Sequence, residues 1–107
     1  MTVFDSDHFD AMTAGDRALQ LEVIALFRDQ ADAWRAACGR ADGWREAVHT
    51  MKGSARGIGL FALAAACETA EQAHAEAGAL DRVGDALVEA LAGLDQFAAS
   101  LPGDQAR

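Results

Sequence analysis

The sequence predicts an all-α protein, and three observations support that prediction. Alanine, leucine, glutamate and arginine are abundant, whereas the 107 residues include one proline and no tyrosine. Residues with a β-branched side chain are few, and this balance favours helices over strands. Apolar residues also recur three and four positions apart in four successive segments, which is the spacing of one helix face. Four such helices joined by short loops bury their apolar faces most simply as an antiparallel up-down-up-down four-helix bundle.

The chain opens with a segment, residues 1–12, in which two phenylalanines stand among aspartates. We expect this segment to form a short N-terminal helical arm across one end of the bundle. The first long helix is predicted to begin at Thr13, because Thr13 and Asp16 resemble a capping box with Asp in place of Glu, and to end at Gly39. Its apolar face consists of Leu19, Val23, Ile24, Phe27, Ala31, Trp34 and Cys38.

The second long helix is predicted to begin after Asp42, which serves as its N-cap, and to end near Gly57 to Gly59. A third helix follows a tight turn and extends to about Ala77, where Gly78 ends it. Its apolar face consists of Leu60, Leu63, Ala66, Cys67, Ala70 and His74.

The fourth helix is predicted to be capped by Asp81 and stopped by Pro102-Gly103. Residues 104–107 then form a frayed tail. No linker or repeat divides the chain, and its length suits one hydrophobic core, so residues 1–107 are expected to be a single domain. The apolar face of this last helix consists of Val83, Leu87, Leu91, Leu94, Phe97, Ala98 and Leu101.

The chain carries 17 acidic and 9 basic residues, which gives a formal charge of -8. This charge argues against binding to DNA or RNA, because neutralising phosphates needs a basic surface. No basic and apolar leader opens the sequence, and the longest apolar run, Leu60 to Cys67, is far too short to span a membrane. We therefore expect a cytoplasmic protein without nucleic-acid or membrane contact, in which Cys38 and Cys67 are reduced core residues.

One stretch of the second long helix departs from a plain amphipathic pattern. At 100° per residue, its apolar residues fall on one side, and nearly opposite them lie Arg45, His49, Lys52, Gly53 and Arg56. We call these five residues the basic stripe. Lys52 is the only lysine in the chain. Glycine inside a helix costs about 1 kcal/mol relative to alanine, so Gly53, one turn after the histidine, predicts that another protein approaches closely there.

The second and third long helices together carry a spaced set of residues: His49-x-x-Lys52-Gly53-Ser54-Ala55, Gly59, Leu63, Cys67 and Glu71. This set resembles the signature of the histidine-containing phosphotransfer (HPt) domains of bacterial two-component phosphorelays. The resemblance covers almost the whole chain, because the long first helix with Phe27 and the loop at residues 41–43 also match the family's layout.

The resemblance implies a role in phosphoryl transfer. In that family the histidine receives a phosphoryl group from an aspartate of one receiver domain and gives it to an aspartate of another, and His49 matches that position. Lys52 matches the lysine that steadies the phosphoryl oxygens, and Gly53 matches the glycine that leaves room for the partner. An imidazole suits this chemistry because it is nucleophilic at neutral pH without a base to deprotonate it first.

Three further residues are candidates with open alternatives. Glu71 lies 22 residues after His49, on the helix that returns antiparallel to it, where it could accept a hydrogen bond from one ring nitrogen. The resemblance implies that Glu71 orients the imidazole, and an ordinary surface glutamate is the alternative. Arg56 is either a partner contact or a solvated charge, and Arg45 has only its place on the basic stripe in its favour.

Together these residues predict a phosphoryl carrier and not an enzyme with its own nucleotide site. We expect His49 to accept phosphate from the receiver domain of a hybrid sensor kinase and to pass it to a response regulator, with the chain acting as a monomer. No cofactor or metal ion is expected on this chain, and Mg²⁺ is expected on the partner receiver. The alternative is a helical docking module that binds a receiver or kinase domain without taking phosphate.

Overall fold

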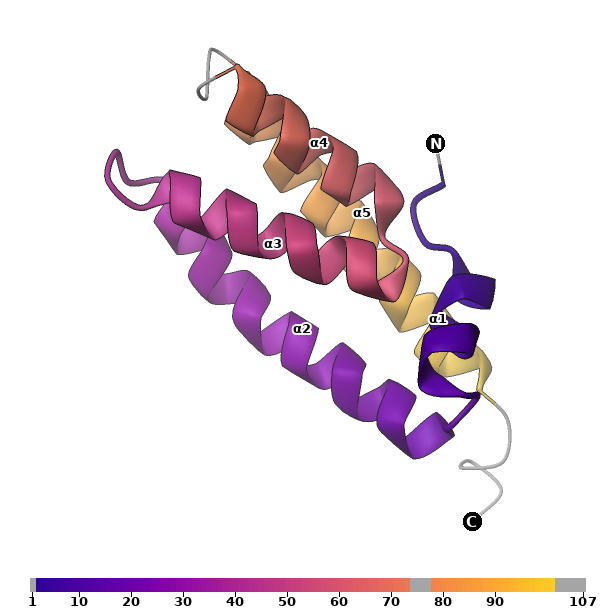
Figure 1. Cartoon of the computed structure of the whole chain (residues 1–107). Coiled ribbons are helices and arrows are strands. Elements are labelled where there is room, and N and C mark those ends of the chain that lie inside the picture. The colour runs from indigo at the N-terminus through magenta and orange to yellow at the C-terminus, as the bar shows by residue number, and fades with distance from the viewer. Residues whose placement is uncertain (1, 74–77, 102–107) are drawn as a thin grey trace.

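The structure is a computed structural model, and it describes residues 2–73 and 78–101. These residues form five helices and no strand: α1 (Ser6–Thr13), α2 (Arg17–Cys38), α3 (Trp44–Ile58), α4 (Phe61–Gln72) and α5 (Ala79–Ser100). The four longer helices run up and down in alternation, and α1 lies at one end of them (Figure 1). The predicted all-α four-helix bundle with a short N-terminal helical arm is therefore confirmed.

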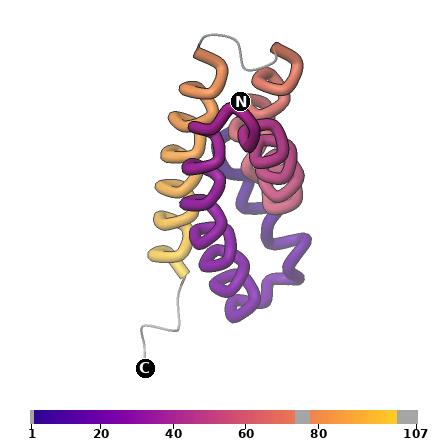
Figure 2. The backbone as a smooth tube through the Cα atoms, turned by 90° about the vertical axis from the view of Figure 1, so that its left-hand side faces the viewer, coloured from indigo at the N-terminus to yellow at the C-terminus, as the bar shows by residue number. Residues whose placement is uncertain are grey.

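The four long helices surround one apolar core. Helix α3 packs most extensively against α4, and α4 packs against α5, while α2 lies beside both α3 and α5. Figure 2 shows the side of the bundle on which α2 and α5 are neighbours. Each long helix contributes buried side chains from the apolar face that the sequence predicts, among them Phe27, Trp34, Val48, Met51, Leu63, Cys67, Val83 and Leu87.

The predicted start of the first long helix at Thr13 is wrong. Thr13 ends α1, and a turn at Ala14 and Gly15, both with positive φ, separates it from α2. Asp16 is the N-cap of α2, and its carboxylate accepts a hydrogen bond from the Leu19 amide at 3.1 Å. The two residues that resemble a capping box therefore lie on either side of a break between two helices.

The core contains a polar residue in place of the neighbouring leucine that the apolar pattern assigns to it. Leu19 is exposed, and its neighbour Gln20 is buried. The Gln20 amide group donates to Asp10 Oδ1 at 2.7 Å and to Thr13 Oγ1 at 3.0 Å. Because a buried polar group costs little once it is hydrogen-bonded, these partners on α1 allow the glutamine to occupy a core position.

Two of the predicted N-caps are also wrong. Gly43, and not Asp42, precedes α3, because the two amides after Asp42 both donate to the Arg40 carbonyl in a tight turn. Gly78, with φ of 84°, precedes α5, so Asp81 lies inside the first turn. A carboxylate in that turn still suits the positive end of the helix.

The predicted ends of the first two long helices, at Gly39 and near Gly57 to Gly59, are confirmed. The predicted end of the third helix at about Ala77 is wrong, because α4 ends at Gln72 with Ala73 as its C-cap. Several other predictions concern residues outside the described part of the chain: the place of His74, the stop at Pro102-Gly103 and the frayed tail at 104–107.

The N-terminal segment packs onto the turn between α3 and α4. The Asp5 amide donates to the Gly59 carbonyl at 2.9 Å, and the Ala62 amide donates to the Thr2 carbonyl at 3.1 Å. Phe9 on α1 is fully buried and meets the Phe97 ring edge-on. The arm therefore holds the end of the bundle at which the chain turns from α3 into α4.

Candidate functional site

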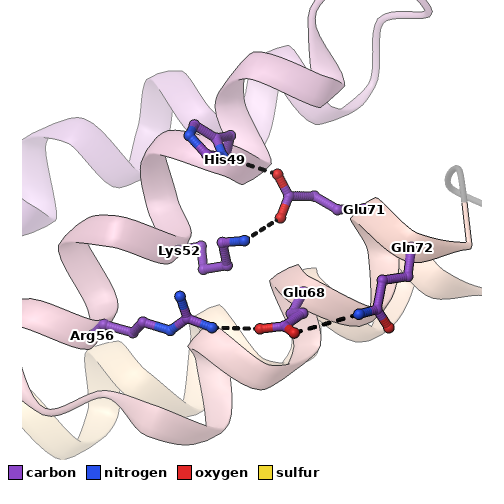
Figure 3. Close-up of polar contacts among 6 residues, drawn as sticks. All are labelled: His49, Lys52, Arg56, Glu68, Glu71 and Gln72. Carbon is purple, nitrogen blue, oxygen red and sulfur yellow. Dashed lines mark hydrogen bonds and ion pairs between the residues drawn. The ribbon is translucent and has the colours of Figure 1, made fainter.

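His49 lies in the middle of α3, on its solvent side. Val48 and Met51 are fully buried and hold this helix against the core, whereas 72% of the His49 side chain is exposed. Its ring nitrogen Nδ1 lies 3.0 Å from Oε2 of Glu71 on α4 (Figure 3). Because an ionised carboxylate accepts and does not donate, Nδ1 carries the shared hydrogen, and the lone pair of the neutral ring is on Nε2.

Lys52 lies about one turn further along α3 and reaches the same carboxylate. Its Nζ donates to Glu71 Oε1 at 2.5 Å, and the Lys52 and Glu71 side chains are 17% and 21% exposed. Glu71 therefore bridges Lys52 and His49, with one oxygen for each (Figure 3). The Lys52 hydrogen bond is the main cause that lowers the pKa of Glu71, desolvation opposes it, and the His49 hydrogen bond lowers the pKa further. Glu71 is thus ionised at neutral pH.

The hairpin formed by α3 and α4 brings these three side chains together. Gly59, with φ of 92°, ends α3, and α4 begins two residues later. The buried residues of α4 include small ones, Ala64 and Ala70, which let the two helices pack closely. In an antiparallel hairpin, a residue further along the second helix faces a residue correspondingly earlier in the first. This register sets Glu71 opposite Lys52 and near His49.

A second contact joins α3 and α4 closer to the turn. Arg56 Nη2 donates to Glu68 Oε1, and Glu68 Oε2 accepts from Gln72 Nε2 at 3.4 Å (Figure 3). Neither Glu68 nor Gln72 is identified from the sequence. The register of the hairpin is the signal that could have found Glu68, because it precedes Glu71 by about one turn just as Arg56 follows Lys52 by about one turn.

The other two residues of the basic stripe, Arg45 and Gly53, lie outside this network. The Arg45 guanidinium stacks on the Trp44 ring, 4.7 Å from its centre. In the described part of the chain, a Cβ atom added to Gly53 would meet no atom within 4 Å beyond its chain neighbours and its own helix backbone. Packing among those residues therefore does not require glycine, and the space above Gly53 is open.

An apolar groove borders Gly53 on the flank of α3 that faces α2. The groove has a volume of about 310 Å³, and the exposed Leu26 on α2 forms part of its wall. Its full lining consists of Val23, Leu26, Phe27, Gln30, Gly53, Ser54, Gly57 and Ile58. The face beside His49 thus offers apolar contact in addition to charge.

Away from this face, Cys38 and Cys67 are both free thiols, as predicted. Burial is the main cause that raises the pKa of Cys67, to about 12. Over residues 2–73 and 78–101, no group of three or more His, Cys, Asp or Glu side chains converges as a metal site. Within the same ranges, no helix is both long and apolar enough to cross a membrane.

Comparison with known proteins agrees with this geometry. The family model for the Hpt domain matches residues 22–100. Among solved structures, the crystal structure of the histidine phosphotransferase ShpA from Caulobacter crescentus is similar, with 38% sequence identity, a TM-score of 0.78 and coverage of 92% of each chain. No curated protein matches the chain significantly. The chain therefore belongs to the Hpt family of histidine-containing phosphotransfer domains.

Proposed function

We propose that this chain is a phosphoryl carrier of a two-component phosphorelay, with His49 as its acceptor. Hpt proteins are phosphocarriers in two-component signalling and interact with receiver domains. One observation carries the proposal for this chain: the Glu71 carboxylate lies 3.0 Å from Nδ1 of His49 and 2.5 Å from Nζ of Lys52. This arrangement supports Nε2 of His49 as the nitrogen that reacts.

The proposed transfer needs no proton to be removed first. The Nε2 lone pair attacks the phosphorus of a receiver phosphoaspartate, the P–O bond to the aspartate breaks, and its electron pair returns to the aspartate carboxylate. The Nδ1 hydrogen stays on the ring, which becomes cationic, so the ionised Glu71 stabilises the phosphorylated ring. The same step in reverse passes the phosphoryl group to the aspartate of a response regulator.

Lys52 and Gly53 are assigned to the approach of the receiver. The Lys52 ammonium stabilises negative charge on the phosphoryl oxygens as they move between histidine and aspartate. Gly53 leaves room for the receiver's active site, and the groove between α2 and α3 supplies apolar contact beside it. Arg45 and Arg56 are assigned to the rim of the same interface.

The donor is the receiver domain of a hybrid sensor kinase, and the final acceptor is a response regulator. The chain acts as a monomer without a cofactor or nucleotide site of its own. Mg²⁺ is proposed to arrive with the receiver, because the α4 carboxylates Glu68 and Glu71 already engage cationic side chains.

Incubation with a phosphorylated receiver domain tests the proposal. The wild-type chain is expected to gain acid-labile phosphate, and His49→Gln is expected to gain none. The variant should keep its fold, because an exposed polar exchange changes stability by less than about 0.5 kcal/mol, and a thermal melt followed by circular dichroism checks this. Label on the Gln variant would contradict the assignment of His49. A wild-type chain that binds the receiver without taking label would instead be a docking module.

A further inference from the structure

The basic stripe on α3 faces an acidic row on α4. Glu71 engages Lys52, and Glu68 engages Arg56, so two of the three cations of the stripe are paired with a carboxylate of this chain (Figure 3). The third, Arg45, stacks on Trp44. The face beside His49 is consequently much less positive than the residues of the basic stripe alone indicate.

The two pairs differ in what surrounds them. Lys52 and Glu71 are mostly buried, and Glu71 also contacts the His49 ring. Arg56 and Glu68 are 53% and 42% exposed, and the further contact of Glu68, from Gln72 Nε2, is long at 3.4 Å. An ion pair this exposed contributes little to folding stability. The main effect of Glu68 is therefore not on folding stability but on the charge of the face beside His49.

We propose that Glu68 is a specificity-determining residue, which neutralises Arg56 and so limits how strongly this face attracts phosphorylated receivers of every kind. This inference rests on the proposed function. A phosphoaspartate brings negative charge to the interface, and a free cation there speeds association with any acidic partner, whatever its shape. Arg56 lies two turns from His49, or about 10 Å along the helix, which is comparable with the Debye length of about 8 Å at physiological ionic strength.

With Arg56 neutralised, discrimination among receivers depends on shape. The apolar groove beside Gly53 provides the surface on which shape is read, because contacts of that kind are lost when a partner's side chains do not fit. The opposite role for Glu68, holding Arg56 in a fixed pose for the partner, requires a rigid pair. The half-exposed Arg56 and Glu68 side chains do not favour that role.

The test compares Glu68→Gln with Glu89→Gln, which removes the same charge from an exposed position on α5. Both changes are made in a His49→Gln chain, so that receivers kept phosphorylated by a small phosphodonor bind without transferring phosphate. Glu68→Gln is expected to raise affinity about 2- to 5-fold at low salt and by little at high salt, because exposed charges are screened. Glu89→Gln and the double variant Arg56→Gln/Glu68→Gln should show no gain.

A panel of receivers from the same organism gives the second readout. Glu68→Gln should raise the affinity for weakly bound receivers at least as much as the affinity for the best one. The ratio of affinities between the best and the next best receiver should therefore not increase. An unchanged or lower affinity, or an equal gain in Glu89→Gln, would overturn the role of Glu68. Failure of the wild-type chain to take phosphate would overturn the proposed function instead, while these binding measurements would still decide the role of Glu68.

Discussion

The carboxylate of Glu71 serves two partners in the resting protein. It accepts hydrogen bonds from Nδ1 of His49 and from Nζ of Lys52. Because Lys52 is already held, part of its side-chain freedom is lost before a phosphoryl group arrives, and less remains to be lost during transfer. Under the proposed function, the ammonium acts on the charge of the phosphoryl group and the carboxylate acts on the ring.

Replacing Lys52 with alanine is expected to slow transfer more than it weakens docking. The ammonium matters most when negative charge is concentrated between His49 and the receiver aspartate, so the single-turnover rate at saturating receiver should fall by about 10-fold or more. Receiver affinity measured on the same variant should change less. Arg82→Ala, which removes an exposed cation on α5 away from the basic stripe, is the matched control. An unchanged rate at saturation would show that Lys52 is a surface charge only.

Replacing Glu71 with glutamine is expected to make stability less dependent on pH. The pKa of Glu71 is lowered from its ordinary value of 4.5, chiefly by the Lys52 hydrogen bond. A lowered folded-state pKa means that the ionised carboxylate stabilises the fold above the ordinary value and loses that effect as pH falls through the lowered one. The difference in unfolding free energy between wild type and Glu71→Gln, from urea titrations, should therefore shrink on acidification. A constant difference from neutral pH to below pH about 4 would contradict the ion pair.

At the scale of elements, α3 combines an anchored face with a face left open. Its buried residues Val48, Met51 and Ala55 hold it in place, while Gly53 has open space above it. Both features lie within four turns of one helix. The helix can therefore present His49 in a fixed position without side-chain bulk beside it.

Gly53→Gln is expected to stabilise the protein while slowing transfer. Helix propensity favours the substitution by up to about 1 kcal/mol, and the new side chain would occupy the space proposed for the receiver. Gly84→Gln on α5 is the control, because Gly84 is also helical with open space around its Cβ position. Melting temperature and transfer rate measured on both variants decide the matter. Undiminished transfer by the Gly53 variant would remove the reason proposed for this glycine.

Features set by one helix alone can be predicted from the sequence. The 3.6-residue period gives the core face of α3, and it also puts His49 and Lys52 on one side of the helix about one turn apart. The glycine at the end of α3 is predictable too, because Gly59 adopts φ of 92°, a conformation that glycine favours.

Features set by contacts between elements are harder to predict. Leu19 and Gln20 exchange their expected places because the partners of Gln20 lie on another helix. Asp42 fails as a cap because a tight turn at Arg40 delays the start of α3. Glu68 has no sequence motif of its own, and only the register between α3 and α4 reveals it.

At the scale of the whole molecule, the bundle separates the exposed face that carries His49 from a closed interior. Cys67 lies on α4 with no exposed surface, and burial is the main cause that raises its pKa, to about 12. Cys38 is only partly buried, and burial raises its pKa as well. The two thiols therefore lie at different depths, Cys67 inside the core and Cys38 at its edge.

Cys67 is expected to react with iodoacetamide only when the bundle opens, because the thiolate is the reactive form and burial also denies the reagent access. Mass spectrometry at mildly alkaline pH should show Cys38 modified first and Cys67 much later. In urea both should react at similar rates, which serves as the control. Modification of Cys67 as fast as that of Cys38 in native buffer would mean that the core is not closed.

The bonding of the N-terminal segment has a consequence for the order in which the chain folds. A ribosome makes Thr2 and Asp5 long before their partners Ala62 and Gly59, and makes Phe9 long before the Phe97 ring that it meets. Contacts between residues so far apart in sequence carry a loop-closure cost before they stabilise the fold. We therefore expect the arm to dock onto the α3–α4 turn and α5 late in folding, after those elements have formed.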